Sequence, residues 1–370
     1  MGERQLIVWC LLGKKAGDNT QVRALATELD LGSVEKFITA RPWELLSHLG
    51  TEPTLMGIDR RQSSDLQAPW PDIVISAGRR NEPVAQWIRQ QSGGLTRLVH
   101  IGRPWAPLSS WDLIVTTPQY FLPQQGNILH NSLPLHHVSL EGLKNVEKQL
   151  RPQLANLPRP WLAVLVGGDS GRFVMTGEKG RRLGSLAADL ATAAGGSVLF
   201  TDSARTPRSA GDALQAQLNV PNLCYRWGSG DDNPYRGLLA LADAFVVTGE
   251  SMSMLGEAMD TGRPLYIFDV GDGAANWWTL PHSYRYKPLS HRLAMHFGPV
   301  RMRRDIGNIQ NTLVRDGGAR WLDPSVIQSA ADALRATITS PAALSHRAGS
   351  VAYNELKRAA QAVRQLVITR

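Results

Sequence analysis

Short apolar runs recur along the first part of the chain, each followed by a polar loop and then by a stretch with helical spacing. The runs are QLIVWCLL (residues 5–12), PDIVISAG (71–78), RLVHIG (97–102) and DLIVTT (112–117). Apolar residues in an unbroken run, rather than at alternate positions, indicate a strand of a parallel sheet that is covered on both faces. Strands that alternate with helices predict βαβ units.

The same pattern starts again after a polar stretch with several prolines at residues 140–160. WLAVLV, SVLFT, LADAFVV and PLYIFDV are the expected strands of this second series. Residues 179–194, which end at two glycines, and residues 350–368 are expected helices. Because 370 residues are enough for two domains, the pattern predicts an α/β chain with two similar domains in tandem.

The composition excludes several classes of protein. Two distant cysteines, Cys10 and Cys224, do not make a disulfide scaffold or a cysteine-rich zinc site. The first residues lack the pattern of a cleavable signal peptide. No apolar run reaches the roughly 18 residues of a membrane-spanning helix. We therefore expect a cytoplasmic protein.

The net charge of +8 favours anionic partners such as nucleotides, phospholipid surfaces or nucleic acid. Because no nucleic-acid-binding motif accompanies the scattered arginines, we expect no nucleic acid partner. A solvated basic surface is the simplest interpretation of the charge. Eleven tryptophans also suit an anionic membrane surface, with the protein peripheral on the inner face of a membrane.

Polar residues at the carboxyl ends of the expected strands are the candidate binding residues, because ligands of open α/β sheets lie there. The loop at residues 13–19 follows the first strand; its glycines would let backbone amides approach a ligand, while Asp18 or Asn19 caps the next helix. Arg79 and Arg80 follow another strand, where two guanidinium groups beside a helix start suit an anion. An ordinary capped turn and surface arginines are the alternatives.

Two further features of the first half carry candidate residues. Arg103 and Trp105 come directly after the VHI strand, and a cation beside an aromatic ring suits a sugar or a lipid head group, or a packed turn. His136 lies in NSLPLHHVS, near the end of this half. A histidine titrates near neutrality, which makes it a candidate general base, with a structural role as the alternative.

Three strand ends of the second half carry glycines, hydroxyl groups and an arginine, all of which suit phosphate. A helix is expected to begin at Ser251, and its N-terminus would attract an anion. Glu257, about two turns further, could accept hydrogen bonds from both hydroxyls of a ribose. Packing alone would be satisfied if Glu250 complements the helix dipole and Glu257 faces solvent. The candidate residues are Gly167, Gly168, Ser170, Ser203, Arg205, Thr206, Thr248, Glu250, Ser251, Ser253, Met254 and Glu257.

The order of these motifs resembles the donor domain of GT-B glycosyltransferases, in which a serine-rich turn holds the nucleotide diphosphate and a glutamate holds the ribose. Counting back from Gly262 and Pro264, Glu257 falls on that glutamate. The resemblance implies an α/β, GT-B-like fold with two Rossmann-like domains, at residues 1–150 and 158–340, that face each other across a cleft. It also implies a C-terminal helix, at residues 343–370, that packs back on the N-terminal domain.

The chain as a whole resembles the mitochondrial-fission protein family named for elongated mitochondria, which has bacterial members. The segments ISAGRR, PLHHV, VGGDSGR and SARTP carry the resemblance, and DDNPYRGLLALADAFVVTGESMSMLGEA is the most specific. PLHHV places His136 on the family histidine. Ala204 and the IGRP segment at residues 101–104 depart from the family pattern, at positions expected to contact donor or acceptor.

These resemblances imply a metal-independent glycosyltransferase that moves a sugar from a nucleotide-diphosphate donor, with a UDP-sugar as first choice, to a saccharide or lipid-linked acceptor. No other cofactor is expected. Helix dipoles and basic side chains would neutralise the leaving diphosphate, and no Asp-x-Asp motif is present. Asp18 or His136 would deprotonate the acceptor. The expected acceptor residues are Gly13, Lys15, Gly17, Asn19, Arg79, Arg80, Arg103 and Trp105.

Two other functions stay open. The eukaryotic member of the family is linked to recruiting a dynamin-like protein, so one alternative is a non-catalytic adaptor on a nucleotide-binding scaffold. Hydroxyls, glycines and an acid at consecutive strand ends favour the enzyme. A nucleotide-sugar epimerase or dehydrogenase would need a dinucleotide fingerprint after the first strand, which GKKAGDN lacks, and a suitably placed Tyr-x-x-x-Lys pair.

Overall fold

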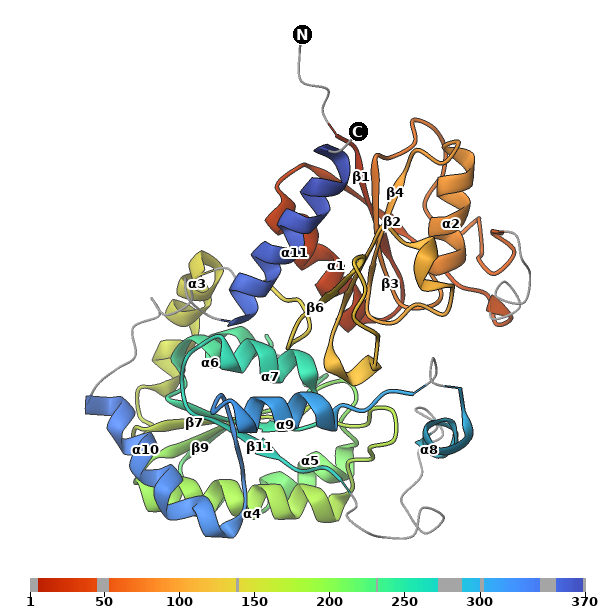
Figure 1. The fold of residues 1–370 in the computed structure, drawn as a ribbon. Helices are drawn as coiled ribbons and strands as arrows, with labels where there is room; N and C mark the ends of the chain where they lie inside the picture. Colours follow the sequence, from red (N-terminus) through yellow and green to blue (C-terminus); the bar gives the residue numbers. More distant parts are fainter. Residues whose placement is uncertain are drawn as a thin grey trace. The chain divides into compact units, whose positions relative to one another are not determined.

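The computed structural model describes residues 6–44, 53–137, 140–230, 232–271, 288–299, 303–339 and 351–368. The contacts within it divide the chain into two compact units. The first unit comprises Met1–His137, Arg303–Asp305 and Val351–Arg370, and the second comprises Val138–Met302 and Ile306–Ser350. Each unit contains one parallel sheet with helices on its faces (Figure 1), which confirms the expected α/β class with two domains.

The first unit is built on a six-stranded sheet. Its strands are β1 (Val8–Leu12), β2 (Ser33–Phe37), β3 (Ile73–Ala77), β4 (Arg97–Ile101), β5 (Leu113–Thr116) and β6 (Ile128–His130). Their order is β2-β1-β3-β4-β5-β6, with every pair parallel. The chain leaves β1 toward one side and returns to β3 on the other. The carboxyl ends of β1 and β3 therefore form a switch point, where open α/β sheets bind ligands.

Helices cover both faces of this sheet. They are α1 (Ala16–Leu29), α2 (Glu82–Gln91) and α11 (Val351–Ile368). Leu25 of α1 and Leu356 of α11 share a core with Ile75 of β3, and Ile88 of α2 packs in the core of the opposite face (Figure 1). The C-terminal helix therefore returns to the first unit, as the sequence predicts; residues 343–350 and 369–370 of the predicted segment lie outside the described residues.

The second unit is built on another six-stranded parallel sheet. Its strands are β7 (Trp161–Leu165), β8 (Ser197–Thr201), β9 (Asn222–Tyr225), β10 (Ala244–Thr248), β11 (Leu265–Phe268) and β12 (Arg320–Trp321). Their order, β12-β11-β10-β7-β8-β9, is that of a Rossmann sheet when read from β9. All residues of β7, β8 and β10 are buried. The switch point of this sheet lies between the carboxyl ends of β7 and β10.

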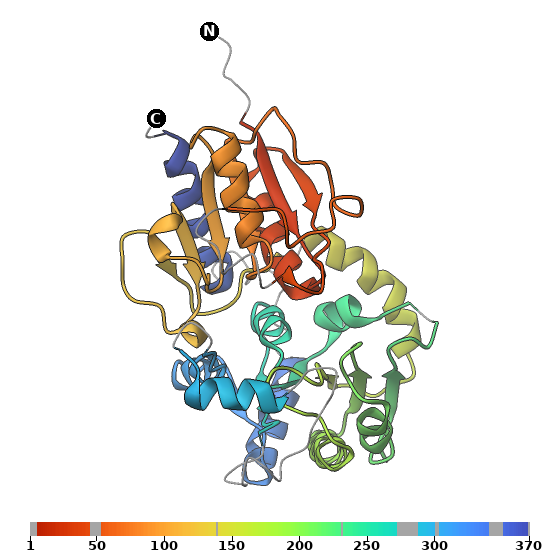
Figure 2. The same cartoon turned by 90° about the vertical axis from the view of Figure 1, so that its right-hand side faces the viewer.

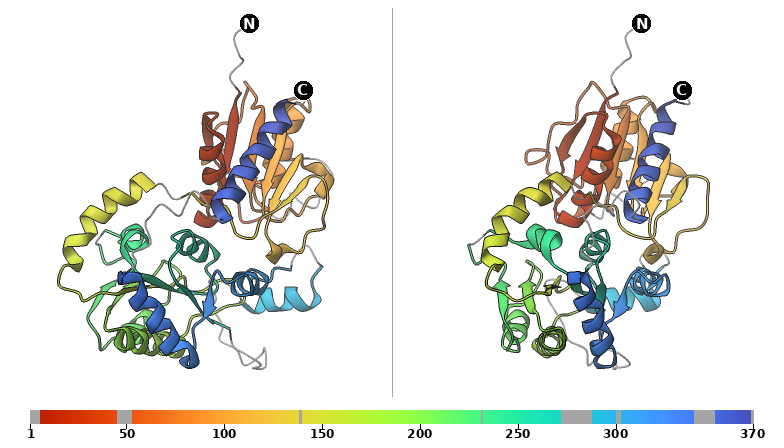
Figure 3. Two further views of the ribbon diagram at one scale, coloured as in Figure 1. Left: turned by 60° about the vertical axis from the view of Figure 1, so that its left-hand side comes forward. Right: turned by 90° about the vertical axis from the view of Figure 1, so that its left-hand side faces the viewer.

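Helices also cover both faces of the second sheet. The helices of this unit are α3 (Leu140–Leu150), α4 (Gly177–Ala194), α5 (Arg208–Gln215), α6 (Tyr235–Leu241), α7 (Met252–Met259), α8 (Pro288–Phe297), α9 (Gly307–Arg315) and α10 (Ile327–Thr339). Packing of α4 with α5 and α10 covers one face, whereas α6 and α7 lie on the other (Figure 2 and Figure 3). α4 ends at Gly195 in the left-handed conformation, the glycine stop that the sequence predicts.

The boundary between the units differs from the predicted one at residue 150. Helix α3 belongs to the second unit because it packs on α6. A side chain at Gly237 of α6 would come within 2.7 Å of Leu150, so the glycine allows this close approach. Among the described residues, no helix is both long and apolar enough to cross a bilayer.

Candidate functional site

Three loops at the carboxyl ends of β7, β8 and β10 interlock at the switch point of the second sheet. We call the loops at residues 166–171, 203–206 and 248–251 the three-loop cradle. The Gly167 N–H donates to Thr248 Oγ1 (2.9 Å), and Thr206 Oγ1 donates to the Val166 carbonyl (3.2 Å). Ser203 Oγ donates to the Gly167 carbonyl. Predicted ligand residues from three strand ends thus lie together, and three of their hydroxyls join the loops to one another.

Two glycines allow the loops of the cradle to approach this closely. A Cβ on Gly167 would lie 2.2 Å from Glu250 Oε1 and 2.6 Å from Ser251 Cβ. Gly168 has φ +97°, and a Cβ there would lie 2.4 Å from the Arg205 carbonyl carbon. Neither position has room for a side chain, so both glycines are needed for the shape of the cradle.

Arg205 is the cation of the cradle. Its Nη1 donates to the Asp169 carbonyl (2.9 Å), and its Nη2 lies 3.9 Å from Glu250 Oε1. The Arg205 side chain is 30% exposed, whereas the Glu250 side chain is fully covered. Burial raises the pKa of Glu250, and the charge of Arg205 opposes that rise. Glu250 Oε1 also accepts from Thr248 Oγ1 (3.1 Å), so the covered carboxylate contacts side chains of the cradle, and its contact with a ligand stays a prediction.

Helix α7 begins directly after the cradle. Ser251 is its N-cap residue, and the Ser251 side chain makes no capping hydrogen bond. Ser253 and Met254, in the first turn, are half-buried. The orphan N–H groups of a helix start, together with its dipole, favour an anion. Ser170 lies on the first loop, in a turn that it closes with two backbone hydrogen bonds to Phe173 (both 3.0 Å).

The Glu257 carboxylate has a partner that the sequence interpretation missed. The Tyr235 hydroxyl donates to Glu257 Oε2 (2.6 Å). Burial and the neighbouring carboxylate raise the pKa of Tyr235 well above its ordinary value, so the hydroxyl keeps its proton. Glu257 therefore does not simply face solvent. Tyr235 lies in DDNPYRG, part of the segment that most specifically resembles the family. That resemblance is the sequence signal that could have pointed to Tyr235.

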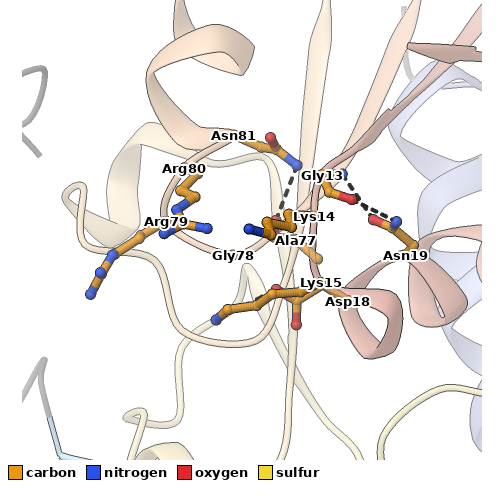
Figure 4. A pocket seen from close by; sticks show the side chains of 10 residues that line it. All are labelled: Gly13, Lys14, Lys15, Asp18, Asn19, Ala77, Gly78, Arg79, Arg80 and Asn81. Carbon is orange, nitrogen blue, oxygen red and sulfur yellow. Dashed lines mark hydrogen bonds and ion pairs between the residues drawn. The ribbon is translucent and has the colours of Figure 1, made fainter. Parts of the chain in front are cut away.

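The switch point of the first sheet contains a hollow of about 410 Å³, partly open to solvent (Figure 4). We call it the basic hollow. Its lining includes six of the predicted residues: Gly13, Lys15, Asp18, Asn19, Arg79 and Arg80. It also includes four that were not predicted: Lys14, Ala77, Gly78 and Asn81. The predicted residues Gly17, Arg103, Trp105 and His136 are not among the residues that line it.

The loop after β1 is shorter than the sequence suggested. Helix α1 already begins at Ala16, so its N-cap is Lys15 and the predicted cap by Asp18 or Asn19 is wrong. Instead, Asn19 Oδ1 accepts from the Gly13 N–H (2.9 Å) and its Nδ2 donates to the Gly13 carbonyl (2.8 Å), as Figure 4 shows. Asn19 therefore shapes the loop backbone from within the helix.

A buried glutamate connects the start of α2 to the loop that follows β4. Both carboxylate oxygens of Glu82 accept from the Trp105 N–H (3.0 and 2.9 Å), and one accepts from Ala106 N–H (2.8 Å). Burial raises the pKa of Glu82 to about 7. The Arg79 guanidinium lies 4.7 Å from the ring of Trp105, a cation–π contact. Trp105 thus helps to orient Arg79, although it does not line the hollow.

Two buried histidines in the first unit differ in their chemistry. His136 Nδ1 lies 3.1 Å from the Pro134 carbonyl; because a carbonyl only accepts, Nδ1 carries a proton. The neutral ring then has its lone pair on Nε2, the form that a general base requires. Burial lowers the pKa of His100 to about 3, and its ring packs on Trp111, so His100 is a neutral core residue.

Comparison with known proteins identifies relatives that match most of the chain. A family model described as "Mitochondrial fission ELM1" matches residues 16–282. The chain is 28% identical over 281 residues to "Mitochondrial fission protein ELM1" of Arabidopsis thaliana. The aligned region covers 68% of this chain and 65% of that protein. It is 23% identical over 299 residues to the uncharacterized protein RP120 of Rickettsia prowazekii, which covers 70% and 82%. The chain thus matches just under two thirds of the plant relative's length.

Solved structures show the same fold at low sequence identity. The UDP-GlcNAc 2-epimerase of Methanocaldococcus jannaschii matches with a TM-score of 0.54 at 10% identity, covering 98% of this chain and all of that one. Identity this low carries information on the fold alone. This structural match and the two Rossmann-like sheets in one chain together confirm the GT-B-like fold class that the sequence predicts.

Proposed function

Because the chain belongs to the mitochondrial fission ELM1 family and has a GT-B-like fold, we propose that it is a glycosyltransferase that uses a nucleotide-diphosphate sugar. One observation carries the proposal: glycine amides, Arg205 and the start of α7 lie together at the switch point of the second sheet, with Glu257 farther along that helix. Packing alone does not require this combination at one sheet edge. UDP is the nucleotide to test first, since a solved structure of this fold is named for a UDP-sugar.

The three-loop cradle would bind the diphosphate of the donor. Amides of the glycine loop and of the first turn of α7 would donate to phosphate oxygens, with Ser253 beside them. Arg205 would offset the negative charge that develops as the diphosphate leaves. Glu257, held by Tyr235, would accept from the ribose. Metal independence stays a prediction; the described residues contain no group of three His, Cys, Asp or Glu that could hold a metal ion.

The acceptor would lie against the first unit. Its hydroxyl oxygen would form a bond to the anomeric carbon of the sugar, while the bond from that carbon to the diphosphate oxygen breaks. The bonding electrons leave with the nucleoside diphosphate, and the hydroxyl proton passes to a base. Asp18, in the basic hollow, and His136, with its lone pair on Nε2, are the two candidates.

A non-catalytic role is the second candidate, and the names of the family and its plant member favour it. An adaptor would keep the nucleotide-binding scaffold and use its surfaces to bind a partner without transferring a sugar. We further propose that the protein is peripheral on a membrane, given its net charge of +8. Failure to bind anionic vesicles at any ionic strength would contradict that part.

A thermal-shift panel with UDP, GDP, CMP and UDP-sugars tests nucleotide binding, which the enzyme requires; sugar transfer to an acceptor then separates the enzyme from an adaptor that keeps the same binding site. The enzyme proposal expects at least one nucleotide to raise the melting temperature of the wild type, because a ligand that binds only the folded state stabilises it. It also expects Glu257→Ala to lose most of that shift while the variant still folds, with a melting temperature lowered by the loss of the hydrogen bond from Tyr235. If no nucleotide stabilises the folded protein, the adaptor becomes the better description.

A further inference from the structure

The basic hollow is unusual in its charge. Four cations line it, namely Lys14, Lys15, Arg79 and Arg80, against one carboxylate, Asp18. Both lysines are exposed, and Lys15 Nζ lies 3.9 Å from Asp18 Oδ2. Arg80 Nε lies 2.6 Å from Glu44 Oε1, outside the lining. Like charges that converge on one concave surface repel one another and raise the local concentration of anions.

Arg79 shows this crowding most directly. Burial lowers its pKa and the neighbouring charge of Arg80 lowers it further, whereas the carboxylates of Glu44 and Glu82 oppose the shift. An arginine nevertheless stays charged, so the neighbouring residues Arg79 and Arg80 bring two positive charges to the lining of the hollow. The contact with Trp105 keeps the Arg79 group oriented. An anion in the hollow would relieve the repulsion and accept bidentate hydrogen bonds from guanidinium.

Two helices begin at the hollow and neither has a side-chain cap. Lys15 precedes α1 and Asn81 precedes α2, and neither side chain makes a capping hydrogen bond. Asn81 instead donates to the carbonyls of Leu11 and Ala77 (3.0 and 3.3 Å). By contrast, Thr176 caps α4 through its hydroxyl. The positive ends of two helix dipoles therefore add to the four cations.

We propose that the basic hollow binds a phosphate group of the acceptor, so that the sugar is transferred to a hydroxyl of a phosphate ester. This inference rests on the proposed function and names the acceptor class. The phosphate would lie among Lys14, Lys15 and Arg80, at the starts of α1 and α2. Asp18, on the same wall, would then take the proton of the acceptor hydroxyl. The ester is either a soluble phosphate or a phospholipid head group, since both present the same chemistry.

Calorimetric titration with glycerol 3-phosphate tests the inference on the full chain. The double variant Lys14→Ala/Lys15→Ala is expected to weaken binding at least about 10-fold, because two charge-assisted hydrogen bonds are lost. Both lysines are exposed, so the fold should be unaffected. The matched control is Arg60→Ala/Arg61→Ala, which removes the same charge from exposed positions of the same unit that do not line the hollow. It should bind like the wild type.

Vesicles distinguish the two sources of the ester. Binding to phosphatidylcholine vesicles that depends on added phosphatidic acid and on Lys14 and Lys15 would assign the lipid head group. Glycerol 3-phosphate binding without vesicle binding would assign a soluble ester. The inference is overturned if neither probe binds the folded wild type, or if the control pair weakens binding as much as the lysine pair.

A UDP titration in the same series separates this inference from the proposed function. UDP should bind the wild type and both double variants equally, because its expected site lies in the second unit. UDP binding without any binding of phosphate esters would overturn the acceptor class alone. Binding of phosphate esters without any nucleotide binding would overturn the proposed transfer, and with it the assignment of the ester as an acceptor.

Discussion

Single residues show how far chemistry can be predicted from the sequence. Glu257 is a candidate ribose ligand because its spacing to Gly262 and Pro264 matches the ribose glutamate of the GT-B domain that this half resembles. Its hydrogen bond with Tyr235 joins residues 22 positions apart and depends on how α6 lies beside α7, which no local pattern specifies. The same limit applies to Glu250: its sequence position suggests a ligand, whereas only packing shows that its side chain is covered by the cradle.

Tyr235→Phe tests whether the hydroxyl positions Glu257. The ring stays, but the carboxylate loses one hydrogen bond, a loss of about 1 kcal/mol. We expect UDP affinity to fall roughly 3- to 10-fold and the melting temperature to change little. The control is Tyr225→Phe on β9, which removes a hydroxyl elsewhere in the same unit. Calorimetric titration measures the UDP affinity of both variants. Equal affinities for the two variants would mean that Tyr235 has no part in binding.

Gly167→Ala tests the close packing of the cradle. The alanine Cβ would lie 2.2 Å from Glu250 Oε1, so the loops must move apart. This overpacking should lower the free energy of unfolding by about 1–3 kcal/mol. We expect lower stability and loss of UDP binding. Gly177→Ala is the control, because its Cβ would have an ordinary contact at 3.6 Å and alanine suits a helix. Full UDP affinity in Gly167→Ala would show that the loop geometry is unimportant.

At the scale of elements, the apolar runs predicted the strands β1, β3, β4, β5, β7, β8, β10 and β11, and helical spacing predicted α4 and α11. The strands that the sequence did not reveal are β2, β6, β9 and β12, which lie at the edges of the two sheets. Edge strands are short or exposed; β2, with the sequence SVEKF, is mostly exposed. They form because a neighbouring strand offers hydrogen bonds, and that context is absent from a local pattern.

The link between α2 and the loop after β4 predicts a pH dependence. The pKa of Glu82 rises from 4.5 to about 7 on folding. Between these values the folded protein holds a proton that the unfolded chain has released, so stability falls as the pH rises through this window. The full effect of Glu82 is up to about 3 kcal/mol.

Urea unfolding at pH 5 and pH 8 measures this effect against Glu82→Gln. The wild type should lose more stability than the variant between the two pH values, because glutamine does not titrate. The comparison is needed because His100 has the opposite effect on stability. Its pKa is lowered from 6.5 to about 3, so its contribution makes stability rise with pH up to about 6.5. Parallel pH profiles for the two proteins would contradict the assignment to Glu82.

At the scale of the whole molecule, the order of elements predicted two Rossmann-like units and the return of the C-terminal helix. The sequence placed the boundary too late because α3 follows the first unit in the chain but packs on α6. The position of the boundary therefore depends on a contact between distant segments, as does the hydrogen bond between Tyr235 and Glu257. The strand order of the structure fixes both switch points, and many of the predicted polar residues lie there, although Gly17, Arg103, Trp105 and His136 do not line the basic hollow.

The returning helix should matter for stability. Leu356 is 1% exposed and packs in the core that α11 shares with α1. Leu356→Ala should lower the free energy of unfolding of the first unit by about 2–5 kcal/mol. Gln361→Ala, on the exposed side of α11, should leave it within about 0.5 kcal/mol. Urea unfolding compares them; equal stability of the two variants would show that α11 contributes little.

The central claim is that the three-loop cradle and Glu257 bind a nucleoside diphosphate. Saturation-transfer NMR with UDP on the wild type and on Glu257→Gln tests it most directly, because the ribose protons report contact at the carboxylate. We predict strong transfer to the ribose in the wild type and a marked loss in the variant, which keeps the size of the side chain. No transfer from UDP, GDP or CMP to the folded wild type would contradict the claim.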